Sequence, residues 1–174
     1  MTPSKRPAGI PAHELWPREA ARARARLYPP TILYTTFTAV MAALVLRTGH
    51  GAAAAAFFAA GVAVWTFLEY FAHRHVLHGD FPDGPSPWRH FLHVRFDHLH
   101  WEHHERPWDS EHINGRIQDT VLWAVSFVAL ASFFPVWSGM MLVAGILQAY
   151  VVEEWVHHSV HFYRFANPYF RYIK

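Results

Sequence analysis

The longest uncharged stretch of the chain covers residues 120–152, which are 33 residues without one Asp, Glu, Lys or Arg. A helix needs only about 20 apolar residues to cross a membrane, so this stretch is too long for a single span. Pro135 and Gly139 interrupt it in the sequence FPVWSG, and proline lacks the backbone N–H that a helix interior requires. The stretch therefore predicts two apolar helices that are joined by a turn near Pro135.

Two shorter uncharged segments precede this stretch, at residues 31–46 and 52–68. Their lengths of 16 and 17 residues are near the lower limit for crossing a hydrocarbon core of about 30 Å. Gly49 and Gly51 can form the turn between them, and Arg47 is the single formal charge in that turn. The two segments therefore predict a first pair of apolar helices.

Together these segments predict an all-α integral membrane protein with four short transmembrane helices. The helices would form two hairpins, at about residues 31–71 and 117–156, within a membrane domain of residues 31–174. A His-rich helical cap would lie on the cytoplasmic side. A soluble all-α protein with a buried helical pair is the alternative, but little polar sequence is left to cover two uncharged hairpins.

Residues 1–30 form a basic N-terminal flank. Its basic residues outnumber Glu14 and Glu19; they are Lys5, Arg6, Arg18, Arg22, Arg24 and Arg26. We expect a short helix here that Pro29 and Pro30 close. A basic flank next to an apolar segment favours the cytoplasmic side of a bacterial inner membrane or of the endoplasmic reticulum, although a plain solvated helix is also possible.

The composition narrows the chemistry further. The chain has no cysteine and 15 histidines, so any metal must be held by His together with Asp or Glu. The formal net charge of +2 is small and its basic residues lie mainly near the N-terminus, so we expect no nucleic-acid partner.

The densest histidine cluster lies in the sequence HLHWEHHERPWD, where His98 is followed by three more histidines within six residues. On a helix, His100, His103 and His104 stand at positions i, i+3 and i+4, within an arc of about 100°. Neutral imidazole suits iron, zinc, copper or nickel better than calcium or magnesium. A metal site is therefore favoured over a solvated His-rich helix face.

Two further clusters follow the ends of apolar segments. In EYFAHRHVLHG, His73 and His78 are five residues apart, about 140° around an ideal helix, so α-helical geometry does not decide which of His73, His75 and His78 act together. In EEWVHHSVHF, His157 and His161 share a helix face. Folding the hairpins together would bring all three clusters to one membrane surface, as in helical bundles whose metal sites form between facing helices.

The order of these clusters resembles the histidine boxes of the membrane-bound fatty acid hydroxylase and sterol desaturase superfamily. The boxes are H-x4-H, H-x2-H-H and H-x3-H. The sequences around them, EYFAHRHVLHG, HHERPWD and NPYFRYIK, are also similar to the family, and the resemblance covers about residues 65–174. The resemblance implies a centre of two iron ions, for which zinc could substitute. The ligands carried over by motif are His73, His78, His100, His103, His104, His157 and His161.

The resemblance further implies an O2-dependent oxygenase that hydroxylates, or less readily desaturates, a long-chain lipid such as a fatty acyl chain or a sterol. Its electrons would come from an external donor of the ferredoxin or cytochrome b5 type, because the chain has no motif for a redox cofactor. A carotenoid hydroxylase of the same family and a non-catalytic membrane metal-binding protein are the alternatives. A transporter should carry charged groups inside its spans, and residues 31–46 and 120–152 have none, so transport is disfavoured.

Other residues near the boxes have more open roles. Five carboxylates could accept from imidazole N–H groups or form surface salt bridges; they are Glu69, Asp97, Asp109, Glu153 and Glu154. Five histidines are expected outside the ligand set; they are His75, His90, His93, His98 and His158. The family usually has one more H-x2-H-H box after a segment like NPYFRYIK, so we expect weak metal binding and low activity from these 174 residues.

Overall fold

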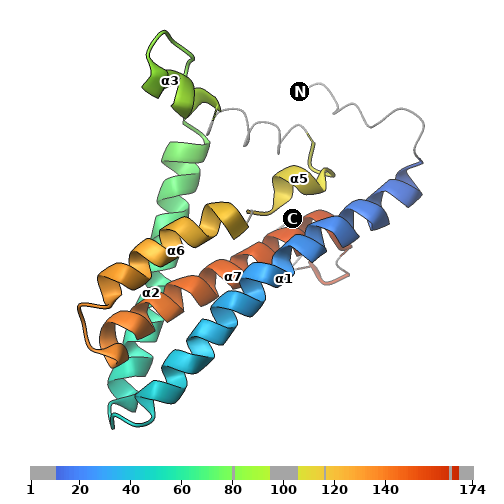
Figure 1. The fold of residues 1–174 in the computed structure, drawn as a ribbon. Helices are drawn as coiled ribbons and strands as arrows, with labels where there is room; N and C mark the ends of the chain where they lie inside the picture. Colours follow the sequence, from blue (N-terminus) through green and yellow to red (C-terminus); the bar gives the residue numbers. More distant parts are fainter. Residues whose placement is uncertain (1–10, 80, 95–105, 116, 165, 169–174) are drawn as a thin grey trace. The chain divides into compact units, whose positions relative to one another are not determined.

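The computed structural model describes residues 11–79, 81–94, 106–115, 117–164 and 166–168 (Figure 1). Every regular element in that part of the chain is helical, as predicted. The chain divides into two compact units. Met1–Ala25, Glu69–Asn114 and His157–Lys174 form the first, which we call the histidine unit, and Arg26–Leu68 and Gly115–Val156 form the second, which we call the apolar unit.

The apolar unit is built from parts of long helices that pack around an aromatic and aliphatic core. These helices are α1 (Ala12–Val45), α2 (Gly51–Phe71), α6 (Ile117–Ala131), the π-helix η3 (Val136–Met140) and α7 (Met141–Phe162). Three of them extend beyond the apolar unit, since residues 12–25 of α1, 69–71 of α2 and 157–162 of α7 belong to the histidine unit. Tyr34, Leu147 and Tyr150 are buried at the centre of this core. The Tyr34 hydroxyl donates to Thr120 Oγ1 at 2.9 Å, which ties α1 to α6.

The predicted break at Pro29 and Pro30 is wrong, because α1 continues through both prolines to Val45. Each proline removes one helical hydrogen bond, and a proline in a helix interior costs about 3 kcal/mol. Packing on both sides of the pair outweighs this cost, since Leu27 before it and Tyr34 after it are 1% and 2% exposed. Prolines are also tolerated in membrane helices where neighbouring helices support the backbone.

Three helical segments are long and apolar enough to cross a membrane: His13–Val45, Gly51–Val76 and Val136–Phe162. The predicted fourth span corresponds to α6, whose apolar part, Thr120–Ala131, is shorter than a usual span. The predicted interruption near Pro135 is confirmed, because α6 ends at Ala131 and η3 begins at Val136. The described part of the chain therefore has three candidate spans and one shorter apolar helix.

The surface of the apolar unit carries many large apolar side chains. Phe67, Leu122 and Phe133 are 72%, 71% and 85% exposed. A surface of this kind is unfavourable in water and is expected where a helix faces lipid. Together with the three candidate spans, it supports an integral membrane protein.

The predicted turn between the first two apolar helices is present. Val45 ends α1, Gly51 begins α2, and Gly49 has a φ angle of +73° in the turn between them. A residue without a Cβ adopts this left-handed conformation at little steric cost, which explains the glycine at this position.

The histidine unit contains short elements between the ends of the long helices. These elements are the π-helix η1 (Ala72–Leu77), α3 (Pro87–Leu92) and α5 (Ser110–Ile113). Asp109 caps α5 by accepting from the backbone N–H of Glu111 at 3.0 Å. These three elements are each only one or two helical turns long. They belong to the same compact unit as the described histidine-rich segments.

Candidate metal centre

The first histidine pair forms in η1, at the end of α2. The backbone N–H of His78 donates to the carbonyl of His73 at 3.0 Å, which is the i→i+5 bond of a π-helix. This wider turn brings the two side chains to the same side, and their Nε2 atoms are 3.2 Å apart. The π-turn therefore pairs two residues that an α-helix would separate by about 140°.

The second pair lies on α7. His157 and His161 are one α-helical turn apart, and their Nε2 atoms are 3.1 Å apart. The two rings meet edge to face, with centroids separated by 4.8 Å. The predicted sharing of one helix face is confirmed for this pair.

The Nε2–Nε2 distance in each pair is compatible with two arrangements. One Nε2 can donate a hydrogen bond to the other where the tautomers differ. Alternatively, two ring nitrogens that each bind one metal at about 2.1 Å lie about 3.0 Å apart at a right angle and about 3.4 Å apart at the tetrahedral angle. The separations in the two pairs, 3.2 and 3.1 Å, fall inside that interval, so the Nε2–Nε2 distance of each pair is compatible with binding of one metal.

The opposite ring nitrogens have partners of the kind that orient metal ligands. His161 Nδ1 lies 3.0 Å from the carbonyl oxygen of Pro107, so Nδ1 carries the proton and Nε2 keeps its lone pair. His73 Nδ1 lies 3.6 Å from Glu69 Oε1, one helical turn away, which is an ion-pair distance and longer than a hydrogen bond. The chemistry of both pairs therefore fits a transition metal bound through Nε2.

The other predicted acidic partners make contacts elsewhere. Glu153 Oε2 accepts from Trp65 Nε1 at 2.8 Å, and Glu154 Oε1 accepts from the backbone N–H of Gly115 at 3.2 Å. Asp109 caps α5, as described above. Asp97 lies outside the described residues. Glu69 has a described contact with the imidazole of His73, a predicted ligand.

The histidines predicted to lie outside the ligand set are engaged in different ways. His75 packs on Phe71 with ring centroids 4.9 Å apart, and His158 is only 1% exposed against Phe162. His93 Nδ1 lies 2.9 Å from the carbonyl oxygen of Phe81. Like His161, His93 thus has its Nδ1 held by a backbone carbonyl.

His90 belongs to an exposed ion pair. Its Nδ1 lies 3.1 Å from Asp83 Oδ1, and the two side chains are 64% and 53% exposed. The hydrogen bond from His90, followed by that from the Gly84 backbone, lowers the pKa of Asp83 below its ordinary value. This pair is a surface feature of the histidine unit.

A cavity of about 450 Å³ lies beside the first pair and is lined by Glu69, Tyr70, His73, Arg74 and His78. Arg74 Nη1 donates to the Tyr70 hydroxyl at 3.1 Å, and its guanidinium carbon is 6.0 Å from the Tyr70 ring centroid. A cation oriented by an aromatic ring therefore faces the same cavity as two of the predicted ligands.

The central box cannot be placed with these pairs. His98, His100, His103 and His104 lie outside the described residues, so their predicted role stays a prediction. Among the residues that are described, no three His, Asp or Glu side chains gather around one point. Sequence reasoning did not single out Pro107 or Ser110, although HHERPWD and the residue after it contain both.

Comparison with known proteins gives related sequences but no structure. No family model and no solved structure matches the chain. Proteins from Mus musculus and Rattus norvegicus, both named fatty acid 2-hydroxylase, are each 30% identical to it over 106 residues, 60% of this chain and 27% of theirs. A protein of the same name from Macaca fascicularis is 28% identical over 131 residues, 75% of this chain and 33% of its own.

These matches confirm the resemblance to the fatty acid hydroxylase and sterol desaturase superfamily of membrane proteins. The relatives are fatty acid 2-hydroxylases by name, and the chain spans about a quarter to a third of their length. The activity, substrates and partners of such a whole protein are therefore proposals for this chain.

Proposed function

We propose that the chain forms a metal-binding part of a membrane-bound oxygenase that hydroxylates a fatty acyl lipid with O2 and external electrons. The observation that carries this proposal is the pairing of His73 with His78 and of His157 with His161 in one compact unit. Proteins named fatty acid 2-hydroxylase supply the reaction class, because they are the relatives that match this sequence.

The metal of the proposal is iron, held as two ions. Four described histidines would contribute Nε2 atoms, and the central box would add His100, His103 and His104. When bound with O2, a pair of irons supplies an oxidant strong enough to take hydrogen from an unactivated C–H bond. Zinc can occupy imidazole sites but has no redox chemistry, so it would substitute without supporting the reaction.

The protein's own contribution is to orient the ligands and the lipid. Pro107 holds His161 in the tautomer whose Nε2 is available. The exposed apolar side chains of the spans suit the acyl chain of a membrane lipid. Arg74, oriented by Tyr70 in the cavity beside His73, suits the anionic head of such a lipid.

A head group bound at Arg74 would limit which carbon reacts. The cavity contains Arg74 and the first histidine pair together, so the carbons nearest the head would lie closest to the metal. This supports oxidation near the carboxyl end rather than in the middle of the chain, in agreement with the 2-hydroxylase name of the relatives.

The proposal also includes a side of the membrane and an electron source. The exposed basic side chains of Arg18, Arg22 and Arg24 precede the apolar part of α1, which favours the cytoplasmic side for the histidine unit. Electrons would arrive on the cytoplasmic side from a soluble or membrane-bound carrier of the ferredoxin or cytochrome b5 type.

The test combines metal content with product analysis. The chain is produced in membranes, purified in detergent, and assayed with free fatty acid, a reductase-coupled donor and 18O2. We expect weakly bound iron and a low yield of an acyl product that carries one 18O next to the carboxyl group. Stoichiometric zinc, with no labelled lipid even after iron loading, would contradict the proposal, and labelled carotenoid without labelled fatty acid would replace its substrate class.

A further inference from the structure

The carboxylate of Glu19 is buried in the histidine unit, although Glu19 belongs to the basic N-terminal flank. The residue is 6% exposed, and Glu19 lies on the inward side of α1 with Leu15 and Ala23, which are 3% and 0% exposed. A buried carboxylate is costly unless it is paired and hydrogen-bonded, so an apolar residue would be the simpler choice for packing alone. Glu19 therefore requires a specific partner.

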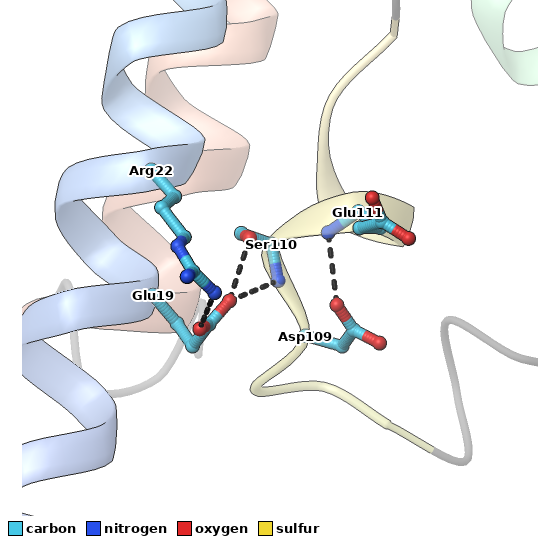
Figure 2. A network of polar contacts seen from close by, with 5 residues as sticks. All are labelled: Glu19, Arg22, Asp109, Ser110 and Glu111. Carbon is cyan, nitrogen blue, oxygen red and sulfur yellow. Dashed lines mark hydrogen bonds and ion pairs between the residues drawn. The ribbon is translucent and has the colours of Figure 1, made fainter.

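That partner is Ser110, at the start of α5. Ser110 Oγ donates to Glu19 Oε2 at 2.6 Å, and the Ser110 backbone N–H approaches the same oxygen at 3.4 Å (Figure 2). The other carboxylate oxygen accepts from Arg22 Nη1 at 2.8 Å. A hydroxyl bound this closely to a carboxylate makes a charge-assisted hydrogen bond, which is stronger than a neutral one.

The segment between Pro107 and Ser110 is held in a fixed shape. The backbone N–H of Asp109 donates to the carbonyl of Arg106 at 2.9 Å, which closes a turn with Pro107 at its second position. The proline ring fixes one of the backbone angles in this turn, and the Asp109 side chain holds the next turn by accepting from Glu111 (Figure 2). A restraint on Ser110 is therefore transmitted to Pro107, three residues earlier.

Pro107 in turn contacts a predicted metal ligand. Its carbonyl oxygen lies 3.0 Å from His161 Nδ1, and this contact sets the tautomer and the orientation of the imidazole. Glu19, Ser110, Pro107 and His161 thus form a continuous chain of contacts within the histidine unit. Each step in it is a short hydrogen bond or a rigid turn.

We propose that Glu19 is a positioning residue for the metal centre: through Ser110 it holds the Pro107 carbonyl against His161 and so keeps His161 Nε2 ready to bind metal. This inference rests on the proposed function, since it takes His161 as a ligand. It gives the N-terminal helix a role beyond membrane attachment, because removal of one carboxylate on α1 would weaken a site formed at the end of α7.

The experiment uses the detergent-purified full chain and the variants E19A, E19Q and S110A. E14A is the matched control, because Glu14 lies on the same helix with its side chain 65% exposed. Two quantities are measured: hydrogen–deuterium exchange of the metal-free protein, and Co2+ affinity from the visible absorption of the bound ion. Neither depends on hydroxylase activity.

We expect E19A and S110A to exchange faster in residues 106–114 and to bind Co2+ about 10-fold more weakly, as is typical when an outer partner of a ligand is lost. The double variant E19A/S110A should be no weaker than either single variant, because both changes break the same contact. E19Q keeps an oxygen that can accept from Ser110, so it should retain more affinity than E19A. E14A should match the wild type in both measurements.

Unchanged exchange in residues 106–114 would overturn the inference, and so would unchanged Co2+ affinity in a variant whose exchange is faster there. If E19A fails to fold, S110A decides the question, since it removes only one hydroxyl. A wild type that binds no metal would refute the proposed function. The exchange of the metal-free variants would still decide whether Glu19 holds the segment that carries Pro107.

Discussion

Gly61 of α2 and Gly145 of α7 face each other so closely that neither position has room for a side chain. A Cβ atom on Gly61 would overlap the carbonyl oxygen of Leu142 and lie 3.0 Å from the Cα of Gly145. A Cβ on Gly145 would overlap the carbonyl oxygen of Phe58. Small residues allow such close approach of membrane helices, where van der Waals packing replaces the hydrophobic effect.

Alanine at either glycine should therefore destabilise the apolar unit. Because the clash is with backbone atoms, the helices must separate, and overpacking of this kind costs about 1–3 kcal/mol. The measurement is the unfolding midpoint in detergent, which should fall for Gly61→Ala and Gly145→Ala. Gly51→Ala is the control, since a Cβ there meets nothing within 4 Å, and it should unfold no earlier than the wild type. Equal midpoints for all three would show that this crossing is looser than described.

The histidine pairs predict a contrast between neighbours on one short element. His73→Ala removes half of the first pair and should reduce metal affinity by more than the about 10- to 100-fold that is typical of an outer partner. His75→Ala is the matched control, because His75 lies on the same π-turn but packs on Phe71. Metal titration of both variants measures the difference. Similar losses at the two positions would refute the assignment of His73.

The second pair should behave like the first. His157→Ala leaves His161 without its partner at 3.1 Å, so we expect a comparable loss of affinity. His90→Ala is the control here, because its described contact is the exposed Asp83. A variant at His90 that loses as much metal as the variant at His157 would move His90 into the ligand set.

The two pairs also show how far the sequence could be read. The face shared by His157 and His161 follows from α-helical spacing and could be predicted. The pairing of His73 with His78 does not follow from helical spacing, because it depends on a π-turn and the usual period of 3.6 residues places them about 140° apart. Only the family resemblance, through the H-x4-H box, indicated that the two act together. The five-residue spacing of the H-x4-H box matches the i→i+5 hydrogen bond of a π-turn. The same spacing fits no single face of an α-helix, which is why the sequence alone left the choice of pair open.

The buried position of Glu19 was missed for a different reason. In a flank rich in arginine, an acidic residue is most simply interpreted as part of a solvated charge pattern. The available signal was the spacing of Leu15, Glu19, Ala23 and Leu27, four residues apart and all buried, which places Glu19 on the inward stripe of α1.

Trp65 and Glu153 make a testable link between α2 and α7. Trp65→Phe removes the indole N–H that donates to Glu153 Oε2 at 2.8 Å, and loss of a hydrogen bond to a partly buried carboxylate costs about 1–3 kcal/mol. We expect a lower unfolding midpoint and unchanged metal affinity. Trp88→Phe, at a position 65% exposed, is the control. A fall in metal affinity for Trp65→Phe would instead show that Glu153 supports the imidazoles, as one interpretation of the sequence suggested.

The pair of Asp83 and His90 predicts a small effect of pH. The pKa of Asp83 is lowered in the folded protein, mainly by the hydrogen bond from His90. The pair therefore stabilises the fold above the unfolded pKa of Asp83, and this contribution is lost as the pH falls through the lowered folded pKa. NMR titration of 13C-labelled aspartate should show Asp83 moving back toward its ordinary pKa in His90→Ala. No movement would mean that the contact does not persist in solution.

Arg74 offers the sharpest test of how the lipid is bound. Arg74→Gln removes the cation from the cavity that contains His73 and His78, while leaving both predicted ligands in place. Hydrogen bonds to charged groups contribute about 1.5–3 kcal/mol, so KM for a free fatty acid should rise about 10-fold or more. Metal affinity and kcat should change little, because Arg74 would act in binding rather than in the reaction. Arg47→Gln, in the turn between α1 and α2, is the matched control.

A second substrate separates binding of the head group from a general effect on the fold. The wild type should have a higher KM for an acyl lipid with a neutral amide head than for the free fatty acid. Arg74→Gln should raise the KM for this neutral lipid only a little further. Tyr70→Phe, which removes the hydroxyl that accepts from Arg74 Nη1, should give a smaller rise in KM with the fatty acid alone. If Arg74→Gln raises KM equally for both lipids, or if it lowers metal affinity, then Arg74 supports the π-turn that carries the first histidine pair and does not bind the head group.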